Sequence, residues 1–124
     1  MGKSVLIVDD EPRLTVALKK RLEVAGYEVF HALNGLAGVE AAALHDPDAI
    51  ILDIRMPDIT GYDACQRIHR LPGLKDVPVL FLSANVQHDA RQKAIEAGGT
   101  AFLSKPYEAS DILSTIEEML SPAA

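Results

Sequence analysis

Residues 49–53 read AIILD, and residues 5–10 read VLIVDD. Both stretches are short apolar runs that end in aspartate, and a third run, VLFL at residues 79–82, is followed by Ser83. Runs that are this short and almost continuously apolar are typical of central parallel strands with helices packed on both faces. The sequence therefore predicts an α/β domain with acidic residues at the ends of its inner strands.

Outward from these runs, strand-length segments alternate with segments of helical period five times along the chain. The predicted strands are Ser4–Val8, Glu28–Ala32, Ala49–Asp53, Val79–Ser83 and Thr100–Ser104. The second of these is the most mixed in polarity, which suits an edge strand. The alternation predicts a single (βα)5 domain over residues 1–124, with a doubly wound parallel sheet and right-handed crossovers.

Apolar spacing also predicts which helix faces are buried. The predicted faces are Leu14, Ala17, Leu18, Leu22 and Ala25 in the first helix, Leu36, Val39, Ala43 and Leu44 in the second, and Ile112, Leu113, Ile116, Met119 and Leu120 in the last. The third and fourth helices are less clearly amphipathic and are placed near Tyr62–Leu71 and Gln87–Ala97.

Composition excludes several classes of protein. The 124 residues carry 12 basic and 18 acidic side chains, a formal charge of −6, and no run of Lys or Arg. Direct binding to nucleic acid or to an anionic membrane is therefore disfavoured. The apolar run Val5–Val8 is too short for a signal peptide or a membrane span, so we expect a cytoplasmic protein. The single cysteine, Cys65, excludes an internal disulfide, and we expect it to be a buried apolar residue.

The residues that can carry chemistry stand at the ends of the predicted strands. They are Asp9-Asp10-Glu11, Asp53, Ser83 and Lys105. Each has an ordinary structural interpretation: Asp10 or Glu11 as a helix cap, Asp53 as a turn former, Ser83 as a strand-end hydroxyl and Lys105 as a surface cation. Parallel strands, however, bring all of them to one edge of the sheet, which is where open α/β sheets bind ligands.

Electrostatics favours a joint role for these residues. Two carboxylates about 4 Å apart repel by roughly 4 kcal/mol at an effective dielectric of about 20, so a cluster of acids needs a cation. The donors are all oxygen, which favours Mg²⁺ or Mn²⁺ over zinc. Asp53 would then be the nucleophile in a phosphoryl transfer, while Lys105 and Ser83 would contact phosphoryl oxygens.

In these residues the chain resembles the receiver domains of two-component response regulators. The resemblance covers essentially the whole chain and is carried by VDDE at 8–11, LDIRMPDITG at 52–61, LSA at 82–84 and FLSKP at 102–106, in this order. It implies a flavodoxin-like sheet with strand order 2-1-3-4-5. It also implies that the domain is a phosphoacceptor for signalling, not an enzyme with a separate substrate, and that it assists its own phosphorylation and autodephosphorylation.

The resemblance also assigns roles to individual residues. It implies that Asp53 is the phosphoacceptor and that Lys105 is the active-site lysine, with a cis bond to Pro106. It implies metal ligands at Asp10 and Asp53, at Asp9 through water, and at the backbone carbonyl of Arg55. Ser83 corresponds to the switch hydroxyl and Phe102 to the aromatic residue that moves inward with it. The side chains of Arg55 and Asn85 are expected to overlook the phosphoryl group and to modulate its lifetime.

Partners follow from the same resemblance. His31, His45, His69 and His88 are interpreted as surface residues, since none stands at a strand end on the predicted active edge. The phosphohistidine donor is therefore expected to be a histidine kinase or a histidine phosphotransfer protein that docks near the first helix. The face made by the fourth helix, fifth strand and fifth helix is expected to signal to an output domain or target protein, and to be the site of any phosphorylation-dependent homodimer.

Three other classes remain as alternatives. A phosphatase with an aspartyl-phosphate intermediate needs an acid two residues after a nucleophilic Asp on the first strand, and Asp9 with Glu11, interrupted by Pro12, imitates this poorly. A binding module without phosphorylation is disfavoured by the complete set of site residues. Flavin binding would need a phosphate loop rich in Ser, Thr and Gly after the first strand, which is missing. The sequence leaves open the kinase, the pathway and whether residues 1–124 come from a longer protein.

Overall fold

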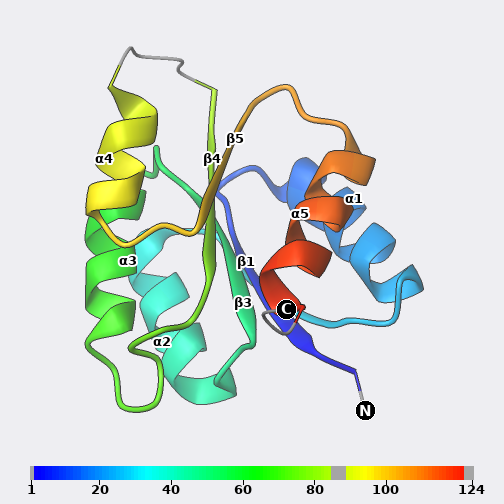
Figure 1. The fold of residues 1–124 in the computed structure, drawn as a ribbon, viewed down its shortest axis with the longest axis horizontal. Coiled ribbons are helices and arrows are strands. Elements are labelled where there is room, and N and C mark those ends of the chain that lie inside the picture. Colours follow the sequence, from blue (N-terminus) through cyan, green and yellow to red (C-terminus); the bar gives the residue numbers. More distant parts are fainter. Residues whose placement is uncertain (1, 85–88, 122–124) are drawn as a thin grey trace.

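A computed structural model describes residues 2–84 and 89–121. The elements are β1 (Ser4–Val8), α1 (Pro12–Val24), β2 (Glu28–Ala32), α2 (Gly35–His45), β3 (Ala49–Asp53), α3 (Gly61–His69), β4 (Val79–Ser83), α4 (Ala90–Glu96), β5 (Ala101–Ser104) and α5 (Ala109–Leu120). The strands pair in parallel in the order β2-β1-β3-β4-β5. In Figure 1, α1 and α5 lie on one side of the sheet, and α2, α3 and α4 lie on the other. The predicted fold class is confirmed.

Two apolar cores flank the sheet, because successive strand residues point to opposite faces. Leu6, Ile50 and Phe81 belong to the core on the side of α2, α3 and α4. Ile7 and Ile51 belong to the other core, where Leu18, Leu22, Ile112 and Ile116 of α1 and α5 cover the sheet. The three inner strands, β1, β3 and β4, are buried along their whole length. Within the described residues, no helix is long and apolar enough to cross a bilayer.

Local signals set the helix bounds. The side chain of Thr60 accepts a hydrogen bond from the backbone N–H of Asp63 at 3.1 Å, so α3 begins at Gly61, one residue earlier than predicted, and it ends two residues earlier, at His69. The predicted start of α4 at Gln87 lies outside the described residues, and the described helix begins at Ala90. Gly98 follows α4 with a φ of 99°, a backbone conformation that glycine adopts without strain.

The predicted buried face of α2 is wrong except at Val39, which is half-buried and packs against the core. Leu36 and Leu44 are 46% and 77% exposed, whereas Ala42 is completely buried. Gly38 is also buried, and a Cβ added there would lie 2.8 Å from the methyl carbons of Val8. The helix therefore approaches β1 through its small residues, and this close packing turns two of its leucines toward solvent.

Candidate active site

Two buried aspartates stand side by side where β1 and β3 end. Val8 and Leu52 are paired in register, so the residues that follow them, Asp9 and Asp53, leave adjacent strands at the same edge of the sheet. Asp9 is 2% exposed and Asp53 is 4% exposed. Asp10 is exposed, yet each of the three carboxylates offers an oxygen within 4.8 Å of the others. The predicted convergence of the three acids is confirmed.

Lys105 joins this cluster from the end of the edge strand β5. Its Nζ donates to Asp9 Oδ2 at 3.1 Å, to Asp53 Oδ2 at 3.3 Å and to Glu11 Oε1 at 3.2 Å. Its backbone N–H donates to the carbonyl oxygen of Ser83 at 2.8 Å, which fixes the chain beside β4. The bond from Lys105 to Pro106 is cis, the isomer that the resemblance implied. One ammonium therefore bridges acids that are far apart in the sequence.

The charges in this cluster perturb one another. Burial raises the pKa of Asp53, and the charge of Asp9 raises it further, while the charge of Lys105 and its hydrogen bond oppose both effects. Burial by itself lowers the pKa of Lys105, but the charges of Asp53 and Asp9 and the hydrogen bonds outweigh it, so that pKa is raised. Three carboxylates contact the one ammonium, and a fourth, that of Asp10, lies within 4.8 Å of two of them. The cluster thus carries surplus negative charge.

Glu11 is the contact that sequence reasoning missed. It occupies the N-cap position of α1, but its side chain makes no capping hydrogen bond and reaches Lys105 instead. Its backbone N–H donates to Asp9 Oδ1 at 2.9 Å, which fixes the turn after β1. A residue beside a helix start is ordinarily interpreted as a cap. Only its position as a third consecutive acid at a strand end hinted at the contact with Lys105.

The other predicted site residues that the structure describes lie on β4 and β5 and just after β3. Ser83 ends β4 and is 3% exposed, and Phe102 on β5 is 8% exposed. The exposed Arg55 donates its backbone N–H to Asp53 Oδ1 at 3.3 Å. A hollow of about 120 Å³ lies between Arg55, Ser83 and Tyr62. Asn85 lies outside the described residues.

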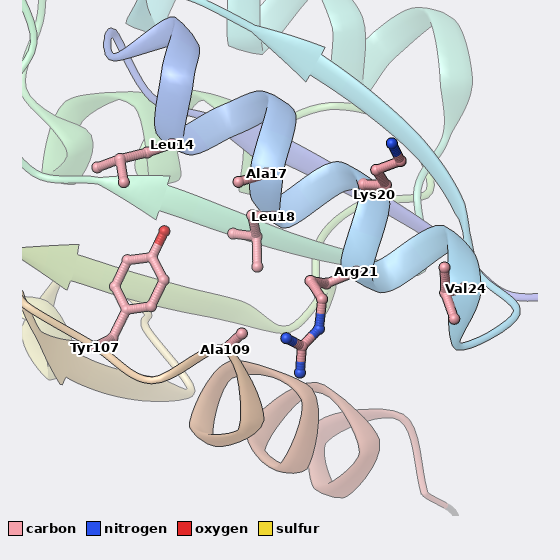
Figure 2. Close-up of a pocket in the computed structure, with 8 residues that line it drawn as sticks. All are labelled: Leu14, Ala17, Leu18, Lys20, Arg21, Val24, Tyr107 and Ala109. Carbon is pink, nitrogen blue, oxygen red and sulfur yellow. The ribbon is translucent and has the colours of Figure 1, made fainter.

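A groove of about 570 Å³ lies between α1 and the beginning of α5. Figure 2 shows its lining, which is mainly apolar with two cationic side chains: Leu14, Ala17, Leu18, Lys20, Arg21, Val24, Tyr107 and Ala109. A neighbouring hollow shares Leu14 and Tyr107 with the groove and is also lined by Glu11 and Lys105. The groove therefore leads along α1 to the charged cluster.

Comparisons with known proteins agree with this geometry. The family of response regulator receiver domains matches residues 5–117. The chain is 34% identical over 116 residues to the DNA-binding dual master transcriptional regulator RpaA of Synechocystis, covering 94% of this chain and 48% of that protein. It is 37% identical over 112 residues to the transcriptional regulatory protein KdpE of Mycobacterium tuberculosis, covering 90% and 48%. The chain thus spans about half the length of these curated relatives.

Solved structures are similar along the whole fold. A putative response regulator from Chloroflexus aurantiacus superposes with a TM-score of 0.91 at 33% identity, covering 98% of this chain and all of that one. The receiver domain of the sensor histidine kinase PA1611 from Pseudomonas aeruginosa superposes with a TM-score of 0.87 at 29% identity, covering 97% and 98%. In that structure a magnesium ion is coordinated in the active-site cleft.

Proposed function

The chain belongs to the response regulator receiver family of two-component systems, and from this premise we propose that Asp53 accepts a phosphoryl group from a phosphohistidine donor in an Mg²⁺-dependent reaction. Residues 1–124 would act as one receiver domain. The observation that carries the proposal is the position of Lys105 Nζ, 3.1 Å from Asp9 and 3.3 Å from Asp53, beside a third carboxylate, Asp10.

The residues present fit a divalent cation. Octahedral Mg²⁺ with ligands at about 2.1 Å places its ligand oxygens about 2.9 to 4.2 Å apart, and one oxygen from each of the three acids already lies within 4.8 Å of the others. We propose that Asp10 and Asp53 hold Mg²⁺ or Mn²⁺ directly, Asp9 through water, and Arg55 through its backbone carbonyl. When bound, the cation neutralises charge on the phosphoryl group.

The chain's own residues carry the transfer. An oxygen of the Asp53 carboxylate bonds to phosphorus while the nitrogen–phosphorus bond of the donor breaks, and the donor imidazole leaves with the electron pair. Lys105, held beside Asp53, contacts a phosphoryl oxygen and stabilises the added negative charge. Ser83, at the end of β4, moves toward the phosphoryl group and donates a hydrogen bond from its hydroxyl to another phosphoryl oxygen. Phe102 then occupies the inner position that the movement of Ser83 leaves open.

The groove of Figure 2 supports docking of the donor against α1. Its apolar lining suits a helix of a histidine kinase or phosphotransfer protein, and Lys105 is among the residues that line the neighbouring hollow. Lys20 and Arg21 at its rim favour a donor with acidic residues beside the apolar ones. Phosphorylation is proposed to change the face made by α4, β5 and α5. This change would be the signal to an output domain, a target protein or a second copy. We propose a cytoplasmic location and no direct contact with nucleic acid or membrane.

Arg55 is proposed to protect the phosphorylated state. It is exposed and stands two residues after Asp53, where its guanidinium can screen the side from which water attacks. Arg55→Ala should therefore hydrolyse its aspartyl phosphate faster than wild type. An unchanged or slower hydrolysis rate would reject this role.

Incubation with acetyl phosphate and Mg²⁺ tests the central proposal. Mass spectrometry should detect one alkali-labile phosphoryl adduct on Asp53, which disappears in Asp53→Asn and when EDTA removes the metal. Glu23→Gln, a change at an exposed residue of α1 away from the cluster, is the matched control and should retain the adduct. An adduct on another residue, or catalytic release of phosphate from phosphate esters, would overturn the assignment of Asp53 as a phosphoacceptor.

A further inference from the structure

Phe102 is held inward by protein contacts. Its register partner across β4 and β5 is Phe81, which is completely buried. Both rings belong to the core on the side of α4, together with Ala90 and Ala94 of that helix. Apolar residues of β4 and α4 therefore line the inner position of Phe102.

Arg91 covers the outer side of the same ring. Its guanidinium carbon lies 5.2 Å from the centroid of Phe102, within the roughly 6 Å over which a cation is attracted to an aromatic face. Arg91 itself is exposed and stands in the first turn of α4. The two residues also line a small hollow of about 80 Å³ between α4 and β5. Arg91 thus closes over Phe102 from the helix that packs beside it.

No competing partner draws Arg91 away from the ring among the residues that the structure describes. Lys93, on the same helix, is paired with Asp89 at 3.2 Å. The other ion pairs in the described ranges belong to Lys105. The guanidinium is therefore available to the aromatic face.

We propose that Arg91 is a positioning residue that holds Phe102 in its inner position and so sets how far the signalling face is switched before phosphorylation. This inference rests on the proposed function, because Phe102 matters for signalling only if the chain is a phosphoacceptor. A cation–π contact at an exposed site changes the ratio of inward to outward Phe102 roughly two- to five-fold. Arg91 therefore raises the basal signal, and the phosphoryl group has a smaller remaining population to shift.

Fluorine NMR can follow this ratio directly. The chain has only three phenylalanines, so labelling with 4-fluorophenylalanine gives three resonances, and Phe102→Leu identifies the one of interest. Wild type, Arg91→Gln and Arg91→Lys are compared with and without Mg²⁺ and beryllofluoride, a mimic of aspartyl phosphate. Lys75→Gln, which removes a positive charge from an exposed loop, is the matched control.

In Arg91→Gln, the Phe102 resonance should move toward the outward position, with a two- to five-fold change in the ratio of inward to outward Phe102. In Arg91→Lys and Lys75→Gln it should hardly move. With the phosphoryl mimic, all variants should converge on the inward resonance, which a general loss of structure would not produce. An unchanged Phe102 resonance in Arg91→Gln would overturn the role of Arg91 even if Asp53 is phosphorylated normally. Failure of the mimic to bind any variant would instead count against the proposed function, while the comparison without the mimic would still decide whether Arg91 holds the ring.

Discussion

Replacement of Lys105 by Met should destabilise the fold by about 3 kcal/mol at neutral pH in the absence of metal. The side chains of Asp9 and Asp53 are 3% and 6% exposed, and Lys105 Nζ lies 3.1 and 3.3 Å from their oxygens. At an effective dielectric of about 20, each contact is worth about 5 kcal/mol of attraction. The two acids, whose oxygens lie within 4.8 Å, repel by at least about 3.5 kcal/mol at the same dielectric.

Much of this attraction is offset by the cost of removing the charges from water, which is several kcal/mol for each buried ion. Removal of the ammonium alone leaves two buried carboxylates that are neither paired nor well solvated, and such changes cost about 3 to 5 kcal/mol. Asp53→Asn keeps the shape of the side chain and removes one of the repelling charges. The double variant should therefore recover at least about 1.5 kcal/mol relative to the sum of the single changes.

Urea unfolding of the four proteins of this cycle in EDTA measures the coupling, with Lys75→Met as the control for loss of a surface charge. Added Mg²⁺ should stabilise Lys105→Met more than wild type. Binding to the folded state raises its stability by mass action, and the cluster of the variant attracts the cation more strongly because it has more uncompensated negative charge. If Lys105→Met unfolds within about 0.5 kcal/mol of wild type, or if the cycle is additive, the acids and Lys105 do not form one electrostatic unit.

Three further predictions concern the surroundings of the site. Hydrogen bonding from the backbone N–H of Leu36 holds the pKa of Asp58 below its ordinary 3.8. The Asp58 carboxylate therefore stabilises the fold fully above about pH 4, and this contribution is lost as the pH falls further. In urea unfolding, the stability difference between wild type and Asp58→Ala should be present at pH 7 and shrink toward pH 2. Gly61→Ala would place a Cβ 2.8 Å from the Cα of Ile54, a backbone atom that cannot move aside freely, and should cost about 1 to 3 kcal/mol in the same assay. Burial raises the pKa of Cys65 to about 12, so iodoacetamide at pH 8 should leave the native protein unmodified and alkylate it in urea, as mass spectrometry would show.

The sequence predicted the inner strands and the gathering of acids because both follow from local pattern and parallel pairing. The bounds of β3 and β4 agree with the prediction to the residue, since their apolar runs stop where the chain reaches the sheet edge. The strand order came only from the family resemblance. A repeating βα pattern is compatible with several orders of strands, and the pattern of a single chain does not choose among them.

Predictions failed where a contact depends on side chains brought together across the fold. His69 was interpreted as a surface residue, yet it is half-buried and its Nε2 lies 3.0 Å from the carbonyl oxygen of Val77. His45 is exposed, as predicted, but the sequence did not indicate that its ring stacks on Phe30 of β2, with ring centroids 3.8 Å apart. The first contact joins α3 to the loop before β4 and the second joins α2 to β2, and a helical or strand period carries no information about either.

The loop after Asp53 is held by hydrogen bonds that would keep one half of the site fixed during the proposed switch. Asp58 accepts the backbone N–H groups of Gly35 and Leu36 at 2.9 and 2.8 Å, which ties the loop to the start of α2. At its far end, the N–H of Gly61 donates to the carbonyl oxygen of Ile54 at 2.8 Å. The acid half is thus held by backbone hydrogen bonds on the side of β1 and β3. Phe102, on the edge strand, packs against Phe81 and residues of α4, and the exposed Arg91 of this seven-residue helix lies over its ring. Under the proposed function, a few kcal/mol of phosphoryl contacts would therefore act on that side without disturbing the acids proposed to receive the phosphoryl group.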